Sequence, residues 1–483
     1  MTLEPGAPEQ PEALRTRFLN RRMVMSDREE VEKLAAAIRE LLTAPAGLGD
    51  QSSREELQNL LRGQYPADLA DAMRLLSDTE DEEVFKLLDA AEAAEVIDEV
   101  DAATEARLLR DTPPDRLARI LENLPSDEGA DVVGGLDPPA VDAVLQLVEP
   151  GAAARIRALL PYPGDTAGGI MSTGFVAVPE SATQAQALDL FRASTTADDL
   201  FFLYAVDDSG ALAGTLDLRR LVTVNPETPI RDITRRDVIS INPEMDQEQV
   251  ANIFARYDLT ALPVVEAPSG KLLGVITADD VIDVLQEESA EDLMAIAGSD
   301  AEELEKRTPA RVAILRLPWI MTTMFVELFA GLVIHIFHTT LTRIILLASF
   351  MPIISAISGN TGLQSATIIV RGLSTGDIQI ANWRHAVKRQ LGTTLILGAA
   401  CGLTLGAIGA FWYHKWSFGV VVAVGMFAAV NIAGVVGTIV PLTSKRLGFD
   451  PALTAGPFET AFQDVVGISI FLGLATMMLR WLQ

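Results

Sequence analysis

The spacing of apolar positions divides the chain into a largely polar front and an apolar back. After residue 317 the chain contains five apolar stretches, and each is long enough to cross a hydrocarbon core of about 30 Å as a helix. These stretches cover residues 318–337, 344–370, 391–412, 418–443 and 453–481. The pattern predicts an all-α, polytopic membrane domain with five transmembrane helices at 317–483.

A looser helical pattern precedes this region. Over residues 53–165, leucines and valines recur at spacings of three and four, which place them on one face of a helix. Proline, aspartate or threonine opens most of the repeated units, as helix N-termini prefer. Short helices repeated in this way stack into a superhelix. We therefore expect an all-α, helical-repeat N domain at 53–165 behind an N-terminal extension at 1–52.

The next region repeats internally. LYAVDDSGALAGTLDLRRLV at 203–222 aligns with LPVVEAPSGKLLGVITADDVI at 262–282. Both segments have the pattern of strand, turn, strand and helix, and an extended segment followed by a helix precedes each. The repeat resembles a tandem pair of cystathionine-β-synthase (CBS) domains, which implies two α/β domains at 166–230 and 231–286.

A nucleotide is a candidate ligand of this pair. In CBS domains, a Thr and an Asp after the last strand commonly meet the phosphate and ribose of an adenosine ligand. GVITADD places Thr277 and Asp280 at those positions, whereas the first repeat has GTLDLRR, which ends in arginines (from Arg219) in place of the Asp. The resemblance thus implies ATP or another adenine nucleotide as a ligand, and the alternative is a structural pair that binds none.

Charge separates the same two parts of the chain. The sequence contains 66 Asp or Glu and 38 Lys or Arg, for a formal net charge of −28, but residues 301–483 contain 8 of the acids and 13 of the bases. The front is therefore strongly acidic, which argues against nucleic-acid binding. An acidic surface suits divalent cations, and the alternative is a solvated face that favours solubility.

Basic residues beside the apolar stretches predict the orientation in the membrane. If the N-terminal domains are cytoplasmic, only Arg343, Lys415 and Arg480 lie outside. The bases inside are then Lys306, Arg307, Arg311, Arg316, Arg371, Arg384, Lys388, Arg389, Lys445 and Arg446. We expect a multi-pass protein of the plasma or inner membrane, surrounded by lipid, with its C-terminus on the outer side.

Three acidic residues lie within the apolar stretches: Glu327, Glu459 and Asp464. An ionised carboxylate in hydrocarbon is costly unless it faces water, a cation or a partner, so each is a candidate for cation or proton traffic. In the fifth stretch, Gly456-Pro457 should break the helix just before Asp464 and expose carbonyl groups such as that of Ala455.

The second stretch contains GNTGLQSATIIVRGL at 359–373. Gly359 allows close approach of a neighbouring backbone, and Asn360 brings an amide to hydrocarbon depth. Polar groups at this depth are tolerated where they are buried or line a cavity. A pore lining is one interpretation, and hydrogen bonding between helices is the other.

Together these features resemble one family. The helical repeat ending in TAGGIMST (166–173), the CBS pair, and the five spans with GNTGLQSATIIVRGL and DPALTAGPFETAFQDVVG (450–467) are similar to the MgtE family of magnesium channels and transporters. The resemblance implies a homodimer that conducts Mg²⁺ through a pore formed largely by the second and fifth spans. It also implies that Asp464 coordinates the ion and that Asp450 lies near the cytoplasmic mouth. Glu459 has no counterpart in the family pattern, and it is either a second pore acid or a shielded packing residue.

The chemistry of Mg²⁺ agrees with such a pore. Mg²⁺ prefers octahedral oxygen ligands and loses water reluctantly, so a slightly wide ring of oxygens can hold the hydrated ion. Two-fold symmetry would set two copies of Asp464 against one ion. We expect the pore metal site to be formed by Asp464, Asp450, Asn360, Gly359 and Ala455.

An acidic cluster at the end of the second CBS domain is a candidate gate. It consists of Asp280, Asp283, Glu287, Glu288, Glu291 and Asp292, and helical spacing puts four of these six on roughly one face. Since like charges repel, closure needs divalent cations that bridge to acids of the other protomer or of the N domain, where Asp89 and Glu92 are candidates. Loss of Mg²⁺ would then separate the domains, and a plug-like connecting helix at 287–316, broken near Gly298, would transmit the motion. The alternative is simple solvation.

The leading hypothesis is a Mg²⁺-selective channel that intracellular Mg²⁺ closes. Within transport, the alternatives are a carrier for Mn²⁺ or Co²⁺ and a proton-coupled carrier of divalent cations. From another class, the alternative is a membrane-anchored metal or nucleotide sensor without transport, which the intramembrane acids argue against. The sequence contains no catalytic triad, P-loop or HExxH motif, so we do not expect an enzyme.

Overall fold

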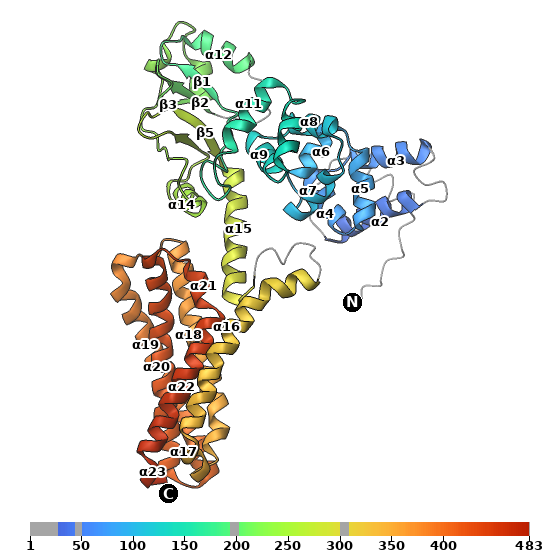
Figure 1. Cartoon of the computed structure of the whole chain (residues 1–483). Coiled ribbons are helices and arrows are strands. Elements are labelled where there is room, and N and C mark those ends of the chain that lie inside the picture. The colour runs from blue at the N-terminus through green and yellow to red at the C-terminus, as the bar shows by residue number, and fades with distance from the viewer. Residues whose placement is uncertain (1–27, 44–50, 194–201, 300–308, 483) are drawn as a thin grey trace, which may run out of the picture. The chain divides into compact units, whose positions relative to one another are not determined.

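The computed structural model describes residues 28–43, 51–193, 202–299 and 309–482. The chain forms two compact units, residues 1–282 and 283–483, and the boundary falls within one helix, α15 (Ala278–Ala297). Figure 1 shows the elements of each unit along the chain.

In the first part of unit 1, up to Leu159, the described residues form helices and no strands, as expected. Its helices are α2 (Arg28–Thr43), α3 (Gln51–Leu61), α4 (Pro66–Arg74), α5 (Asp78–Leu87), α6 (Ala90–Ile97), α7 (Ala102–Arg110), α8 (Pro114–Leu121), α9 (Ser126–Gly134), α10 (Pro138–Leu145) and α11 (Pro150–Leu159). Prolines occupy the first turn of α4, α8, α10 and α11, where no intrahelical N–H bond is lost. Each of α4, α6 and α8 packs on the helix two elements later, which produces the superhelix.

The CBS region contains two similar hairpins. In the first, β1 (Val176–Pro179) pairs parallel with β2 (Phe202–Val206), which pairs antiparallel with β3 (Leu212–Asp217). In the second, β4 (Ala261–Val265) pairs antiparallel with β5 (Leu272–Thr277). The flanking elements are α12 (Gln184–Ala193), α13 (Leu218–Thr223), the short 3₁₀ turn Ile230–Asp232 and α14 (Gln247–Tyr257). Both hairpins shift register at the same place, at Ala205/Val206 and at Val264/Val265, which confirms the internal repeat.

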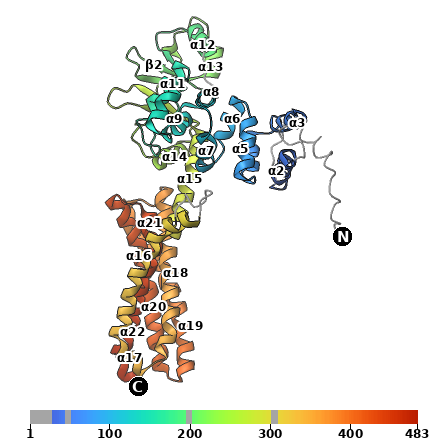
Figure 2. The ribbon, with the colours of Figure 1, turned by 45° about the vertical axis from the view of Figure 1, so that its right-hand side comes forward.

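Unit 2 contains five helices that are long and apolar enough to cross a membrane, counted over its described residues. They are α16 (Pro309–Ile336), α18 (Leu347–Ser374), α19 (Trp383–Tyr413), α20 (Trp416–Leu447) and α22 (Pro457–Met477). Shorter helices are α17 (His338–Arg343), α21 (Pro451–Ala455) and α23 (Leu479–Leu482), and a 3₁₀ turn covers Ile380–Asn382. The long helices run side by side in both views of the chain (Figures 1 and 2).

The predicted breaks both occur. Gly456 separates α21 from α22 with φ −92° and ψ −131°. Gly298, at φ 73°, ends α15, because this left-handed conformation favours glycine. The connecting helix expected at 287–316 is therefore divided between the end of α15 and the start of α16, and residues 300–308 lie outside the described part.

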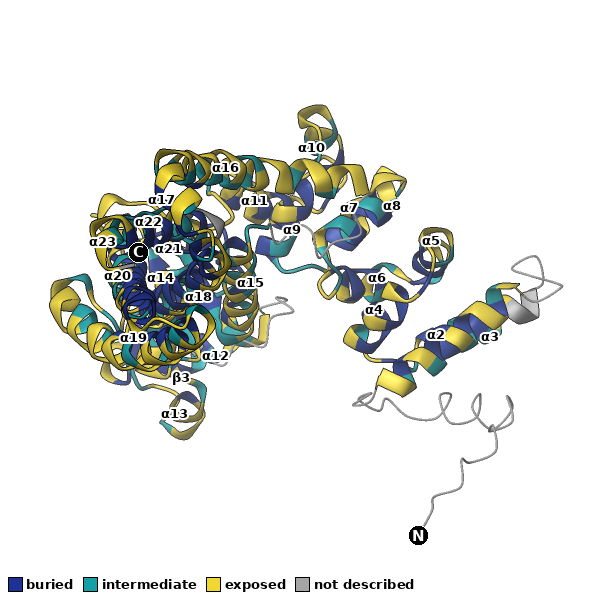
Figure 3. Cartoon of the chain, turned by 90° about the horizontal axis from the view of Figure 1, so that it is seen from below, coloured by how far each residue is buried: buried dark blue, intermediate teal, exposed yellow. Residues whose placement is uncertain are grey.

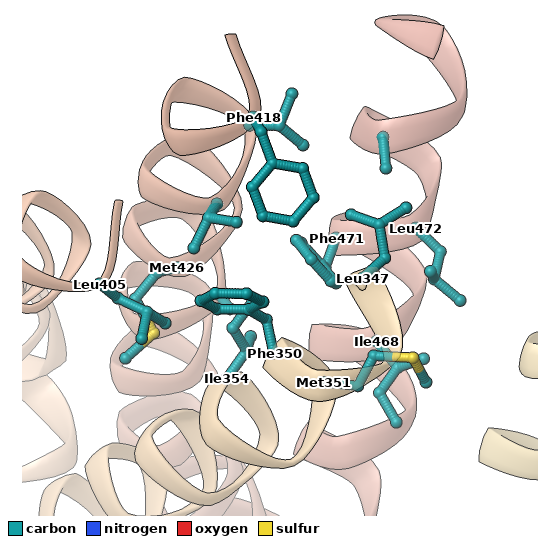
Figure 4. Packing of buried hydrophobic residues seen from close by; sticks show 14 of the residues in the cluster. Leu347, Phe350, Met351, Ile354, Leu405, Phe418, Met426, Ile468, Phe471 and Leu472 are labelled. Carbon is teal, nitrogen blue, oxygen red and sulfur yellow. The ribbon is translucent and has the colours of Figure 1, made fainter. Parts of the chain in front are cut away.

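The core of unit 2 lies where α18, α20 and α22 meet. Phe350, Phe418 and Phe471 are fully buried there, and Figure 4 shows them packed among Leu347, Met426 and Leu472. By contrast, α16 is exposed along most of its length, as its yellow residues in Figure 3 indicate. The three inner helices thus form the packed part that positions Glu459 and Asp464, whereas Glu327 lies on α16.

Candidate functional site

Asp464 lies at the contact of three membrane helices. It is half-buried on α22. A Cβ atom on Gly359 of α18 would stand 3.8 Å from Asp464 Oδ1 and 3.3 Å from Thr460 Cγ2, so the glycine lets the two helices approach here. The carboxyl group of Glu327, on α16, interacts directly with that of Asp464. Two carboxyl groups this close repel each other when both are ionised, and a bound cation or a shared proton relieves the repulsion.

The sequence had singled out Glu327 and Asp464 separately, and only the packing of α16 on α22 joins them. Nothing in the local sequence signals the pair, since the two residues lie 137 positions apart.

A polar stripe follows one exposed face of α18. Asn360, Gln364 and Thr367 are all exposed in the single chain, at spacings of four and three. Gly359 and Gly362, on other sides of the same helix, are buried against the neighbouring helices. Exposed amide and hydroxyl groups at this depth are poorly suited to lipid, so the stripe needs water or a protein partner.

Asp450 directly precedes α21 and Ala455 is its last residue, before the helix break. Asp450 is exposed, and its Oδ1 accepts a hydrogen bond from Ala452 N at 2.8 Å, which caps α21. Ala455 is fully buried in a small cluster with Ala295 of α15 and Val370 of α18. Both predicted pore residues therefore precede α22, the helix that contains Asp464. They lie at the end of the bundle against which the C-terminal end of α15 packs.

The end of α15 packs closely against this break. A Cβ atom on Gly456 would stand 2.6 Å from the carbonyl oxygen of Ile296. Ser374 Oγ donates a hydrogen bond to Asp292 Oδ2 at 2.9 Å. Burial raises the pKa of Asp292 and the nearby charge of Asp450 adds to the rise, whereas the Ser374 hydrogen bond and the Arg371 charge oppose it. The charges of a predicted gate residue, Asp292, and of a predicted pore residue, Asp450, therefore influence each other.

The remaining predicted gate residues lie along α15. Asp283, Glu287 and Glu291 are exposed, and Glu288 is half-buried. Among the described residues of this single chain, no three His, Cys, Asp or Glu side chains are arranged to hold a metal ion.

The two candidates in the N domain have a local structural role. Asp89 caps α6 by accepting hydrogen bonds from Ala91 N at 3.1 Å and Glu92 N at 2.9 Å. Glu92 accepts in return from Asp89 N at 2.9 Å and pairs with Arg62 at 3.4 Å. Such a reciprocal capping box stabilises a helix start by itself.

Thr277 and Asp280 also contact each other. Asp280 Oδ2 accepts hydrogen bonds from Thr277 N at 2.9 Å and Thr277 Oγ1 at 2.7 Å. Ala261, which pairs with Thr277 across the sheet, lines a cavity of about 560 Å³ within the CBS region. Arg235 and Asp237 line the same cavity and offer a cation and a carboxylate to a polar ligand. The sequence motif indicated Thr277 and Asp280 near this cavity but missed Arg235 and Asp237, which no local sequence signal distinguishes.

Glu459 occupies a different face of α22 from Asp464. Its side chain is 1% exposed, and its Oε1 accepts a hydrogen bond from Gln463 Nε2 at 2.9 Å. The structure therefore supports the interpretation of Glu459 as a shielded residue within the bundle.

Three family models match the chain. They are described as the MgtE intracellular N domain over residues 64–165, the CBS domain over 230–287, and a divalent cation transporter over 351–474.

Curated relatives match over most of their length. A protein named magnesium transporter MgtE from Enterococcus faecalis is 34% identical over 330 residues, which cover 68% of this chain and 72% of the relative. A protein of the same name from Thermus thermophilus is 34% identical over 348 residues, covering 71% of this chain and 77% of the relative.

A solved structure described as the cytosolic domain of the Mg²⁺ channel MgtE in complex with ATP is 36% identical to the matched part. It covers 52% of this chain and 99% of its own, with a TM-score of 0.47.

Proposed function

The chain belongs to the MgtE family of magnesium transporters, and we propose that Mg²⁺ crosses its membrane unit along a path past Asp464. Membership makes the chain a transporter and not an enzyme. The observation that carries the path is the meeting of Glu327, Asp464 and Gly359 within the apolar bundle. Carboxylates brought together in hydrocarbon need a cation or a proton, and Mg²⁺ supplies the charge.

A homodimer completes this path. The exposed stripe of Asn360, Gln364 and Thr367 on α18 needs a polar neighbour, and a second copy with its own stripe provides one. A two-fold axis beside α18 and α22 then sets two Asp464 carboxylates against one hydrated ion. Lipid surrounds the apolar outer faces of the dimer.

Direct ligation of the bare ion is unnecessary in this arrangement. Asp464 and the Asn360 amide can hold the waters of hydrated Mg²⁺, so the dehydration cost is avoided. The Gly359 and Ala455 carbonyl groups are further candidate ligands, and Asp450 attracts cations at the cytoplasmic mouth.

Intracellular Mg²⁺ closes the path through α15. The end of this helix contacts Gly456, directly before the pore helix, so a shift of α15 reaches α22. Mg²⁺ bound at Asp280, Asp283, Glu287, Glu288, Glu291 and Asp292, with Asp89 and Glu92 as candidate partners, offsets their repulsion and holds the closed arrangement.

The CBS cavity binds ATP or another adenine nucleotide. Its volume of about 560 Å³ suits a ligand of this size, and Arg235 can pair with a phosphate. Thr277 pairs with Ala261 of the cavity lining, and Asp280 accepts hydrogen bonds from Thr277, so both are candidate contacts of the nucleotide. The N-terminal domains, and hence this cavity, are cytoplasmic, with the C-terminus of the chain outside.

Mg²⁺ entry into liposomes tests the path. Wild type should admit Mg²⁺ when driven by a membrane potential, and Asp464→Ala should reduce entry by at least about tenfold because a key charge in the path is lost. Asp377→Ala, which removes an exposed acid between spans, is the matched control and should conduct as wild type. Equal entry through wild type and Asp464→Ala would reject the path. Entry that requires a proton gradient would favour the coupled carrier.

A further inference from the structure

Glu459 and Gln463 form a buried polar pair that the Mg²⁺ path does not use. Each side chain is 1% exposed. Gln463 Nε2 donates to Glu459 Oε1 at 2.9 Å and lies 3.5 Å from the carbonyl oxygen of Ala433 on α20. Glu459 Oε2 is buried and accepts no hydrogen bond from the described residues.

Glycines of two other helices make the space for this carboxyl group. A Cβ atom on Gly362 of α18 would stand 2.3 Å from Glu459 Oε1 and 2.8 Å from Oε2. A Cβ atom on Gly437 of α20 would stand 2.3 Å from the carbonyl oxygen of Gly362. The Glu459 side chain therefore fills a notch where the glycines let α18, α20 and α22 approach one another.

The charged groups around the notch do not stabilise an ionised Glu459. On α18 the one ionisable side chain is Arg371, nine positions beyond Gly362. On α20 the ionisable side chains are Lys445 and Arg446, which lie eight and nine positions beyond Gly437. The nearer groups are acids: Asp464 on the same helix, with Glu327 of α16 beyond it. A buried carboxylate without a counter-charge is strongly disfavoured, and the neutral acid is the form that this notch accepts.

The notch is linked to the ion path through α18. Gly359 faces Asp464, and Gly362, one turn later, faces Glu459. Gln463 directly precedes Asp464 in the chain. Seating the Glu459–Gln463 pair in the notch thus sets the height and rotation of α22 at which Asp464 reaches Gly359.

We propose that Glu459 is a proton-binding positioning residue, which in its neutral form holds α22 on α18 and α20 and so orients Asp464 toward the ion. This inference rests on the proposed Mg²⁺ path. It distinguishes the two acids of α22: Asp464 acts through its negative charge, whereas Glu459 acts through its shape and hydrogen bond. Loss of the Glu459 proton at alkaline pH expels the side chain from the notch and lowers Mg²⁺ entry.

The test compares full-length wild type, Glu459→Ala and Glu459→Gln in liposomes between pH 6 and pH 9. Glu459→Ala should lose Mg²⁺ entry by about tenfold, and Glu459→Gln, which keeps the size and the neutral state, should restore entry to within about twofold of wild type. Entry through Glu459→Gln should also lack the alkaline decline of wild type. If Glu459→Gln loses as much entry as Asp464→Asn, Glu459 acts as an ionised ligand and the proposal is wrong.

Infrared difference spectra supply a readout that does not depend on transport. At neutral pH, wild type should show the carbonyl band of a protonated carboxylic acid that Glu459→Gln lacks. This comparison does not use Glu459→Ala, so it holds even if that variant fails to fold. An unchanged band would overturn the neutral state of Glu459. If wild type does not conduct Mg²⁺, the proposed function fails, and the infrared band still decides the state of this residue.

Discussion

Ser374, at the C-terminal end of α18, donates a hydrogen bond to Asp292 of α15 at 2.9 Å. The bond joins the helix that leaves the CBS region to the helix that contains Gly359. It lies within unit 2, where burial and the Asp450 charge already raise the pKa of Asp292. Besides the packing of Ala295 and the close approach of Ile296 to Gly456, the end of α15 is therefore joined to α18 by a hydrogen bond to an acid that is costly to ionise in this position.

Removing this donor should weaken closure. The Ser374→Ala variant lacks the hydrogen bond to the Asp292 carboxyl group that joins α15 to α18. More cytoplasmic Mg²⁺ is then needed to close the path. We expect the half-inhibitory Mg²⁺ concentration to rise by on the order of tenfold, measured as Mg²⁺ entry into liposomes against the concentration on the cytoplasmic face.

Thr375→Ala is the matched control for this experiment. Thr375 is adjacent and exposed, and its Oγ1 bonds only locally, to Arg371 O at 2.9 Å and to Asp377 Oδ2 at 3.0 Å. A half-inhibitory concentration that stays the same in Ser374→Ala, or that moves equally in both variants, would show that the Asp292 contact does not hold the gate.

A side chain at Gly456 should displace α15. The Cβ atom of Gly456→Ala would stand 2.6 Å from Ile296 O and 3.0 Å from Ala295 O, both backbone atoms that cannot rotate away. We expect the variant to conduct Mg²⁺ at cytoplasmic concentrations that close wild type. Gly473→Ala, on the same α22 helix, meets nothing within 4 Å and should behave as wild type. Normal closure of Gly456→Ala would contradict the proposed route from α15 to α22.

The N domain should lose stability as pH rises. Burial, together with nearby acids that include Asp98 and Glu105, raises the pKa of Glu128 to about 9, and burial with Asp131 raises that of Glu105 to about 7. Both groups keep their protons in the folded state at pH values where the unfolded chain has released them. Their contribution is thus fully present below about 4.5, the usual value for Glu, and is lost as pH rises through 7 and then 9.

Limited proteolysis of the full-length protein can measure this loss. Cleavage within α7 and α9 should accelerate between pH 6 and pH 9 in wild type, relative to an unstructured substrate of the same protease. The acceleration should be smaller in Glu128→Gln, which is neutral throughout. Glu83→Gln changes an exposed glutamate of the same domain and should follow wild type. Identical pH profiles for all three proteins would contradict the assignment.

Arg235 should contribute to nucleotide affinity. It lines the CBS cavity, and its loss in Arg235→Ala removes a cation that can pair with a phosphate. We expect ATP to bind about tenfold more weakly in isothermal titration of the full-length protein. Arg231→Ala, which removes an exposed arginine beside Asp232 at 3.9 Å, is the control. Unchanged ATP affinity in Arg235→Ala would place the nucleotide elsewhere.

The sequence alone determined the architecture of this protein. The length of an apolar run, the spacing of leucines in 53–165 and the repeated hairpin pattern are local properties, so they identify the five spans, the helical N domain and the CBS pair before any contact is known. Gly298 and Gly456 were likewise found as breaks, because glycine and proline act on their own backbone.

Only the tertiary structure decided which acids meet. Glu327 joins Asp464, the charge of Asp450 acts on Asp292, and Glu459 enters a glycine notch. Each of these relations connects elements far apart in the sequence. The physical reason is that burial and pairing depend on which face of one helix packs on which face of another. Sequence periodicity can therefore mark an acid as costly in the membrane, but the packing of the helices determines what relieves that cost.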